Sequence, residues 1–114
     1  VPDLEVCGAP DGDLLLVSWG GTFGHTINTV RELRKKGKKV SLAHFNYIKP
    51  LPANTAEVFS KFKKILVCEI NLGQFVAYLR DKVPGMAYYQ YNKVKGLPFT
   101  VQELEEAVIK HLEA

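Results

Sequence analysis

A short apolar run that ends in a glycine-rich bend constrains the fold of this chain more than any other stretch. The run, residues 14–19 (LLLVSW), follows Asp13 and stops at the bend, residues 20–24 (GGTFG). It is too short for a buried helix, and its apolar residues are continuous rather than alternating, which predicts a strand covered on both faces. Strands of that kind lie in parallel sheets.

The bend supplies one half of a candidate functional edge. Glycine permits positive φ and close backbone approach, so a ligand or another domain is expected to contact Gly20, Gly21, Thr22 and Gly24. The spacing does not match the dinucleotide-binding pattern G-x-G-x-x-G, because Thr22 and His25 stand where that pattern needs glycine. The phosphate-binding P-loop is also absent, since no Gly-Lys-Ser/Thr follows the bend.

The rest of the chain alternates between strand and helix patterns. We expect strands at 40–45, 65–70 and 86–91, and helices at about 25–36, at 53–62, after residue 71 and after residue 100. Residues 1–13 are expected to be an edge strand or a linker. Such alternation predicts right-handed crossovers and an α/β fold with three layers, α/β/α, around a mostly parallel open sheet of about five strands.

Local signals support two of these helices. Ala56, Phe59 and Phe62 recur at helical spacing and are expected on the inner face of the helix at 53–62. Thr100 with Glu103 three residues later is a capping box that predicts the start of the last helix.

A second group of polar residues follows the strand at 65–70. Glu69 is expected at the carboxyl edge of the sheet, where open sheets bind ligands, together with Asn71, Gly73 and Gln74. Asn71 is also a plausible N-cap of the next helix. The structural alternative for Glu69 is a helix-capping or interdomain hydrogen bond.

Length and composition favour one soluble globular domain, residues 1–114, with a net charge of +3 and 46% hydrophobic residues. Cys7 and Cys68 make no disulfide framework, and neither they nor the histidines have metal-ligand spacing, so we expect no metal site. His25 is expected at a surface and His44 in the core or at the sheet end. Without an 18-residue apolar run or a leader pattern, we expect a cytoplasmic protein that binds neither membrane nor nucleic acid.

Five segments carry a resemblance to a known family. They are 13–24 (DLLLVSWGGTFG), 33–40 (LRKKGKKV), 47–52 (YIKPLP), 65–74 (ILVCEINLGQ) and 91–99 (YNKVKGLPF). The first three resemble the carboxyl-terminal domain of the transketolase superfamily. The last two resemble the end of the alpha subunit of 2-oxoacid:ferredoxin oxidoreductases, with the 2-oxoglutarate enzymes most similar. The resemblance extends from about residue 14 to residue 112.

This resemblance implies a holoenzyme that oxidises a 2-oxoacid with thiamine diphosphate, magnesium, iron-sulfur clusters and coenzyme A and passes electrons to ferredoxin. It implies as partners the remaining domains of the alpha subunit and a thiamine-binding beta subunit. No catalytic or cofactor-binding residue of the family maps onto this chain. The expected role is therefore a non-catalytic structural or assembly domain, cut from a longer subunit.

Two other functions stay open. A free-standing ligand-binding or regulatory module would use the bend at 20–24 and the edge at 69–74. A carboxyl-terminal domain of a thiamine-dependent transketolase or 2-oxoacid dehydrogenase would share the fold without using ferredoxin.

Overall fold

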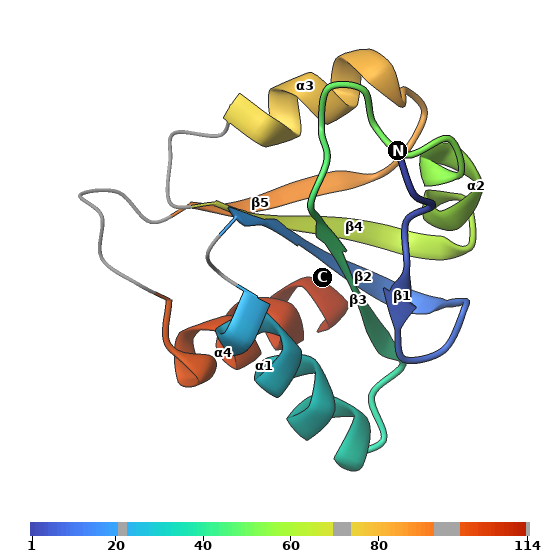
Figure 1. Ribbon diagram of the computed structural model, residues 1–114. Helices are drawn as coiled ribbons and strands as arrows, with labels where there is room; N and C mark the ends of the chain where they lie inside the picture. The colour runs from blue at the N-terminus through green and yellow to red at the C-terminus, as the bar shows by residue number, and fades with distance from the viewer. Residues whose placement is uncertain (21–22, 70–73, 93–98, 114) are drawn as a thin grey trace.

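A central five-stranded sheet organises the chain, with strand order β1-β3-β2-β4-β5 (Figure 1). The computed structural model describes residues 1–20, 23–69, 74–92 and 99–113. The elements are β1 (Val6–Cys7), β2 (Gly12–Trp19), α1 (Phe23–Lys35), β3 (Val40–Phe45), α2 (Thr55–Phe59), β4 (Phe62–Glu69), α3 (Gln74–Lys82), β5 (Tyr88–Asn92) and α4 (Val101–Glu113). β1 pairs antiparallel with β3, and the other neighbours pair in parallel. The mostly parallel sheet is confirmed. Of the two alternatives for residues 1–13, an edge strand or a linker, the structure shows an edge strand at Val6–Cys7.

The helices form two layers, with α1 and α4 on one face of the sheet and α2 and α3 on the other (Figure 1). The central strand β2 shows why both faces are covered. Leu14 and Leu16 pack in the core beneath α1 and α4, whereas Leu15 and Val17 pack in the core beneath α2 and α3. All four side chains are fully buried. Successive strand residues point to opposite faces, so a continuous apolar run is what a doubly covered strand requires.

The termini of α1 and α4 follow standard capping chemistry. Gly37 has φ of 82° after the last turn of α1, and Lys38 N donates to the Leu33 carbonyl oxygen at 3.0 Å, which completes a Schellman-type end. At α4, Glu103 N donates to Thr100 Oγ1 at 3.1 Å, so the predicted cap is confirmed.

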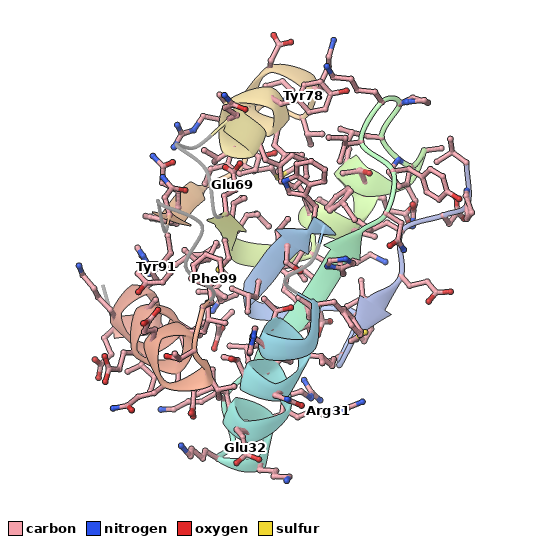
Figure 2. All side chains as sticks on the ribbon, turned by 60° about the vertical axis from the view of Figure 1, so that its left-hand side comes forward. Arg31, Glu32, Glu69, Tyr78, Tyr91 and Phe99 are labelled. Atoms are coloured by element: carbon pink, nitrogen blue, oxygen red, sulfur yellow. The ribbon has the colours of Figure 1, made fainter. Side chains whose placement is uncertain are left out.

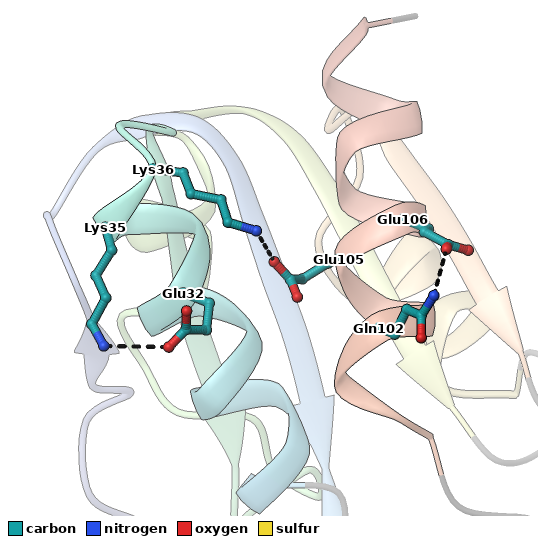
Figure 3. A network of polar contacts seen from close by, with 6 residues as sticks. All are labelled: Glu32, Lys35, Lys36, Gln102, Glu105 and Glu106. Carbon is teal, nitrogen blue, oxygen red and sulfur yellow. Dashed lines mark hydrogen bonds and ion pairs between the residues drawn. The ribbon is translucent and has the colours of Figure 1, made fainter.

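A surface ion pair links the turn after α1 to α4. Lys36 Nζ, directly after the end of α1, lies 2.9 Å from Glu105 Oε1 on α4 (Figure 3).

The predicted helix at 53–62 was too long. α2 contains only Thr55–Phe59, and Phe62 instead begins β4, where it pairs with Gly12 of β2. Phe59 is fully buried as expected, but Ala56 is exposed, so its predicted place on the inner face was wrong. The physical reason is that Phe62 gains ladder hydrogen bonds and burial by extending β4, which leaves α2 little more than one turn. Smaller shifts occur at α1, which begins at Phe23, and at β5, which begins at Tyr88.

Candidate functional site

The sheet topology places a switch point between β2 and β4. From β2 the chain passes to α1 on one face, and from β4 it passes to α3 on the other face (Figure 1). Val17 pairs with Val67 two residues before each strand ends, so Trp19 and Glu69 lie side by side at the carboxyl edge. Ligands of open α/β sheets bind in the crevice at such a point. The crevice between β2 and β4 is therefore the first place to look for a functional site.

Glu69 is built into the fold at this point. Its side chain is only 3% exposed; Oε1 accepts a hydrogen bond from Phe75 N at 2.8 Å, and Oε2 accepts one from Val76 N at 3.2 Å. These amides belong to the first turn of α3, where amide groups lack helical partners and negative charge is favourable. Figure 2 shows Glu69 between the sheet and α3. Helix capping, the structural alternative, is thus what Glu69 does.

A small hollow of about 270 Å³ opens beside Glu69. The Trp19 ring lies over Phe75, with ring centroids 5.8 Å apart, and Trp19 remains 38% exposed. On the far side, Tyr78 donates its hydroxyl hydrogen bond to the Ile48 carbonyl oxygen at 2.6 Å. The loop after β3 is thereby fixed against α3 and closes one wall of the hollow. Lys49 and Gln74 also line it.

Of the eight predicted site residues, four lie among the described residues and four do not. Gly20 directly follows β2 and has φ of 74°, the positive φ that the bend predicted. Gly24 lies exposed in the first turn of α1, with open space where a side chain would stand, and Gln74 is exposed at the start of α3. Gln74 lines the hollow together with Glu69. The remaining four, Gly21, Thr22, Asn71 and Gly73, lie outside the described residues.

The sequence did not predict a polar cluster at the ends of β2 and β3. Ser18 Oγ lies 2.7 Å from His44 Nδ1 and 3.3 Å from Thr26 Oγ1, and Thr26 donates to the Phe23 carbonyl oxygen at 3.0 Å. Burial lowers the pKa of His44, an effect that a hydrogen bond with the Gly20 backbone partly opposes.

A hydroxyl beside an imidazole can form a nucleophile and base. Ser18 is fully buried, however, so a substrate carbonyl cannot reach its Oγ. The cluster instead ties β2, β3 and α1 together, which confirms His44 as a sheet-end histidine. Ser18 pairs with His44 in the β2–β3 register, so aligning the two predicted strands was the signal that could have found the contact.

The described residues offer little to a metal or a nucleophilic reaction. Among 1–20, 23–69, 74–92 and 99–113, no group of three His, Cys, Asp or Glu side chains is placed to hold a metal ion. Cys68 is fully buried, and burial raises the pKa of its thiol, which disfavours the thiolate that binds metals or attacks carbonyls. No helix within these same ranges is long and apolar enough to cross a membrane.

Comparison with curated proteins identifies relatives across most of the chain, although no family model matches it. The 2-oxoglutarate oxidoreductase subunit KorA of Mycobacterium tuberculosis is 42% identical over 106 residues. The chain is homologous to a segment of a 2-oxoacid:ferredoxin oxidoreductase alpha subunit. The 2-oxoacid:ferredoxin oxidoreductase 1 alpha subunit of Aeropyrum pernix is 29% identical over 106 residues. The chain spans only 16% and 17% of the length of these two relatives, while the alignments cover 91% and 90% of the chain itself.

Solved structures share the fold of this chain. The 2-oxoglutarate:ferredoxin oxidoreductase of Magnetococcus marinus, solved with 2-oxoglutarate, coenzyme A and succinyl-CoA, superposes with a TM-score of 0.88 at 24% identity, covering 98% of this chain and 20% of that chain. An inactive tetramer of a split-gene transketolase gives 0.71 at 16% identity, covering 96% and 41%. The alpha chain of a probable 2-oxoacid ferredoxin oxidoreductase from Thermoplasma acidophilum gives 0.67 at 18% identity, covering 98% of both chains. The transketolase-like fold predicted from the sequence is confirmed.

Proposed function

We propose that this chain is a non-catalytic structural and assembly domain of the alpha subunit of a 2-oxoglutarate:ferredoxin oxidoreductase. The observation that carries the proposal is the 42% identity over 106 residues to the KorA subunit, which is described as part of a 2-oxoglutarate oxidoreductase. The proposed holoenzyme cleaves the bond between the carboxylate and the keto carbon of 2-oxoglutarate and releases CO₂. The remaining acyl group forms a thioester with coenzyme A, and the two electrons released pass to ferredoxin.

The chemistry of this reaction needs groups that the described residues do not fit. Thiamine diphosphate, magnesium, iron-sulfur clusters and coenzyme A are the proposed cofactors of the holoenzyme. A cluster needs several accessible thiolates, whereas Cys68 is fully buried and Cys7 lies apart on the edge strand β1. We therefore propose that these groups are bound by the remaining domains of the alpha subunit and by a thiamine-binding beta subunit. We also propose that the holoenzyme is cytoplasmic.

The engagement of the polar groups at the carboxyl edge supports a structural role. Both oxygens of Glu69 accept amide hydrogen bonds of α3, and Ser18 holds His44 at 2.7 Å. Each of these groups already has the partner that a substrate would otherwise supply.

The test uses the native protein that contains this sequence, purified with whatever copurifies. We expect reduction of a viologen dye that requires both 2-oxoglutarate and coenzyme A, and we expect Gln74→Ala to leave kcat and KM for 2-oxoglutarate unchanged. Replacing 2-oxoglutarate by pyruvate serves as the substrate control. Dye reduction that is independent of any 2-oxoacid refutes the oxidoreductase assignment, and a changed KM in Gln74→Ala refutes the non-catalytic role.

A further inference from the structure

A second, larger hollow lies near the β1 edge of the sheet, where the amino-terminal segment runs past the end of β3. Its volume is about 450 Å³, which is in the range of about 300–1,000 Å³ typical of binding pockets. Its walls come from residues 2–7, from the start of α1 and from the loop after β3. None of its lining residues belongs to the crevice between β2 and β4.

The amino-terminal wall is held in place by one asparagine. Asn54 Oδ1 accepts a hydrogen bond from Leu4 N at 2.7 Å, and Asn54 Nδ2 donates to the Leu4 carbonyl oxygen at 3.0 Å. The Leu4 side chain is 6% exposed and packs into the core. Its neighbours Asp3 and Glu5 are exposed and line the hollow. The fold therefore presents two carboxylates from a fixed stretch of backbone.

Another part of the lining is aromatic. Phe23 is 44% exposed and Tyr47 is 50% exposed, so both rings leave much of their surface uncovered. Phe23 is fixed by an edge contact with the His44 ring, with centroids 5.1 Å apart. Exposed aromatic rings that gather at one hollow are typical of docking surfaces.

Charge indicates what such a surface would accept. The chain as a whole carries a net charge of +3, yet among the described residues that line this hollow there are two carboxylates and no lysine or arginine. A partner could offer this hollow a lysine or an arginine side chain. Arginine fits the lining better than lysine, because its planar guanidinium stacks on aromatic rings and pairs with carboxylates through two parallel hydrogen bonds.

We propose that this acid–aromatic hollow receives an arginine-bearing segment of a partner subunit of the enzyme. The inference rests on the proposed function, in which the alpha subunit is paired with a beta subunit. The relative KorA is itself named as a subunit of a 2-oxoglutarate oxidoreductase, which supports the existence of a partner that supplies the segment. The guanidinium pairs with Asp3 and Glu5 and stacks against Phe23 or Tyr47.

Carboxyl footprinting of the assembled native enzyme tests the proposal. A carbodiimide with glycine ethyl ester labels exposed carboxylates, and mass spectrometry locates the labels. We expect Asp3 and Glu5 to be labelled several-fold less in the assembled enzyme than after dissociation. Asp11 and Asp81, which are exposed carboxylates away from the hollow, are the internal controls. Phenylglyoxal labelling of the same samples is expected to show one arginine outside this chain protected in parallel.

Variants distinguish a charge pair between the carboxylates and arginine from simple burial of the carboxylates under a neighbouring subunit. The double variant Asp3→Asn with Glu5→Gln keeps side-chain shape and is expected to weaken assembly about tenfold, because hydrogen bonds to charged groups are lost. The matched control Asp11→Asn with Asp81→Asn is expected to assemble like the wild type. Native mass spectrometry at graded dilution gives the dissociation constants.

Three results would overturn the proposal: equal labelling of Asp3, Glu5 and the controls; a carbodiimide cross-link from either residue to a lysine; or wild-type assembly of the double variant. The viologen assay measures the oxidoreductase activity independently of the labelling, so failure of this inference can be told apart from failure of the proposed function. An active enzyme with unprotected Asp3 and Glu5 overturns the hollow alone, and an inactive assembly with both protected overturns the oxidoreductase assignment alone.

Discussion

At the scale of single residues, Glu69 shows how one carboxylate joins a strand to the following helix. Its two carboxylate oxygens accept hydrogen bonds from the backbone amides of Phe75 and Val76 in the first turn of α3. Glu69→Ala would leave both buried amides without an acceptor and is expected to lower the free energy of unfolding by about 2 kcal/mol or more. Glu69→Gln keeps one acceptor oxygen and is expected to cost less. Urea unfolding measures both, with the exposed Glu57→Ala as control. A loss no larger than that of the control would contradict the capping role.

His44 predicts a dependence of stability on pH. Burial lowers its pKa in the folded protein below the value of 6.5 of the free side chain, so the unfolded chain binds the extra proton first. The stability that neutral His44 contributes to the fold is therefore fully present above about pH 6.5. It is lost as the pH falls toward the pKa of His44 in the folded protein. His111 acts in the same direction, because burial and the charges of Lys110 and Lys64 lower its pKa.

We expect the melting temperature of the wild type to fall as the pH is lowered from 7 to 5, because histidine usually takes up its proton in this range. The slope is expected to be shallower in His44→Asn and shallowest when His111→Asn is added. Equal slopes in the wild type and His44→Asn would argue against a titrating His44.

These residues also mark how far sequence reasoning reaches. Glu69 was predicted at the sheet edge, and its capping role was one of the two alternatives considered, because an acid that precedes a helix satisfies free amides. The contact between Ser18 and His44 was not predicted. It joins residues 26 positions apart, and their proximity depends on the register of two parallel strands, which local pattern does not give.

At the scale of elements, α4 is the helix whose start the sequence predicted best. Thr100→Ala removes the acceptor of Glu103 N and is expected to lower the free energy of unfolding by about 1 kcal/mol. The matched control is Gln102→Ala, which removes an exposed contact of 3.4 Å between Gln102 and Glu106 (Figure 3) and is expected to change stability by less than about 0.5 kcal/mol. Thermal and urea unfolding measure both, and equal effects would disprove the cap.

The helix α2 illustrates the opposite case. Its five residues offer too little periodicity to separate them from the start of β4, because Phe59 and Phe62 repeat at a spacing compatible with one helix. The end of α2 is decided by tertiary pairing of Phe62 with Gly12 in the neighbouring strand. A window of sequence around residue 60 does not contain that partner.

At the scale of the whole molecule, β2 is the middle one of three neighbouring strands, β3, β2 and β4, that contribute buried side chains to both cores. Leu16 packs toward α1 and α4, and Leu15 packs toward α2 and α3. Because both side chains are fully buried, each substitution to alanine is expected to lower the free energy of unfolding by about 2–5 kcal/mol. We expect one cooperative transition in both variants, with the same urea midpoint by near- and far-ultraviolet circular dichroism. Separate midpoints would show that the two layers unfold independently.

The architecture was predictable for a related reason. Doubly covered strands and alternating helices restrict the chain to a parallel sheet between two helical layers, and that result follows from pattern alone. The strand order depends instead on pairing between strands distant in sequence. The walls of the two hollows depend on contacts between a side chain and a distant backbone group, such as Asn54 with Leu4 and Tyr78 with Ile48.

The position of Trp19 has a practical consequence. It is the single tryptophan of the chain, and it stands 38% exposed at the end of β2, over Phe75. Indole fluorescence responds to the polarity of its surroundings, so the emission of the isolated chain reports one location, the carboxyl edge of the sheet. If a neighbouring domain covers that edge, water leaves the ring and the emission moves to shorter wavelength. The polypeptide thus carries its own optical probe of contact between this edge and a neighbouring domain.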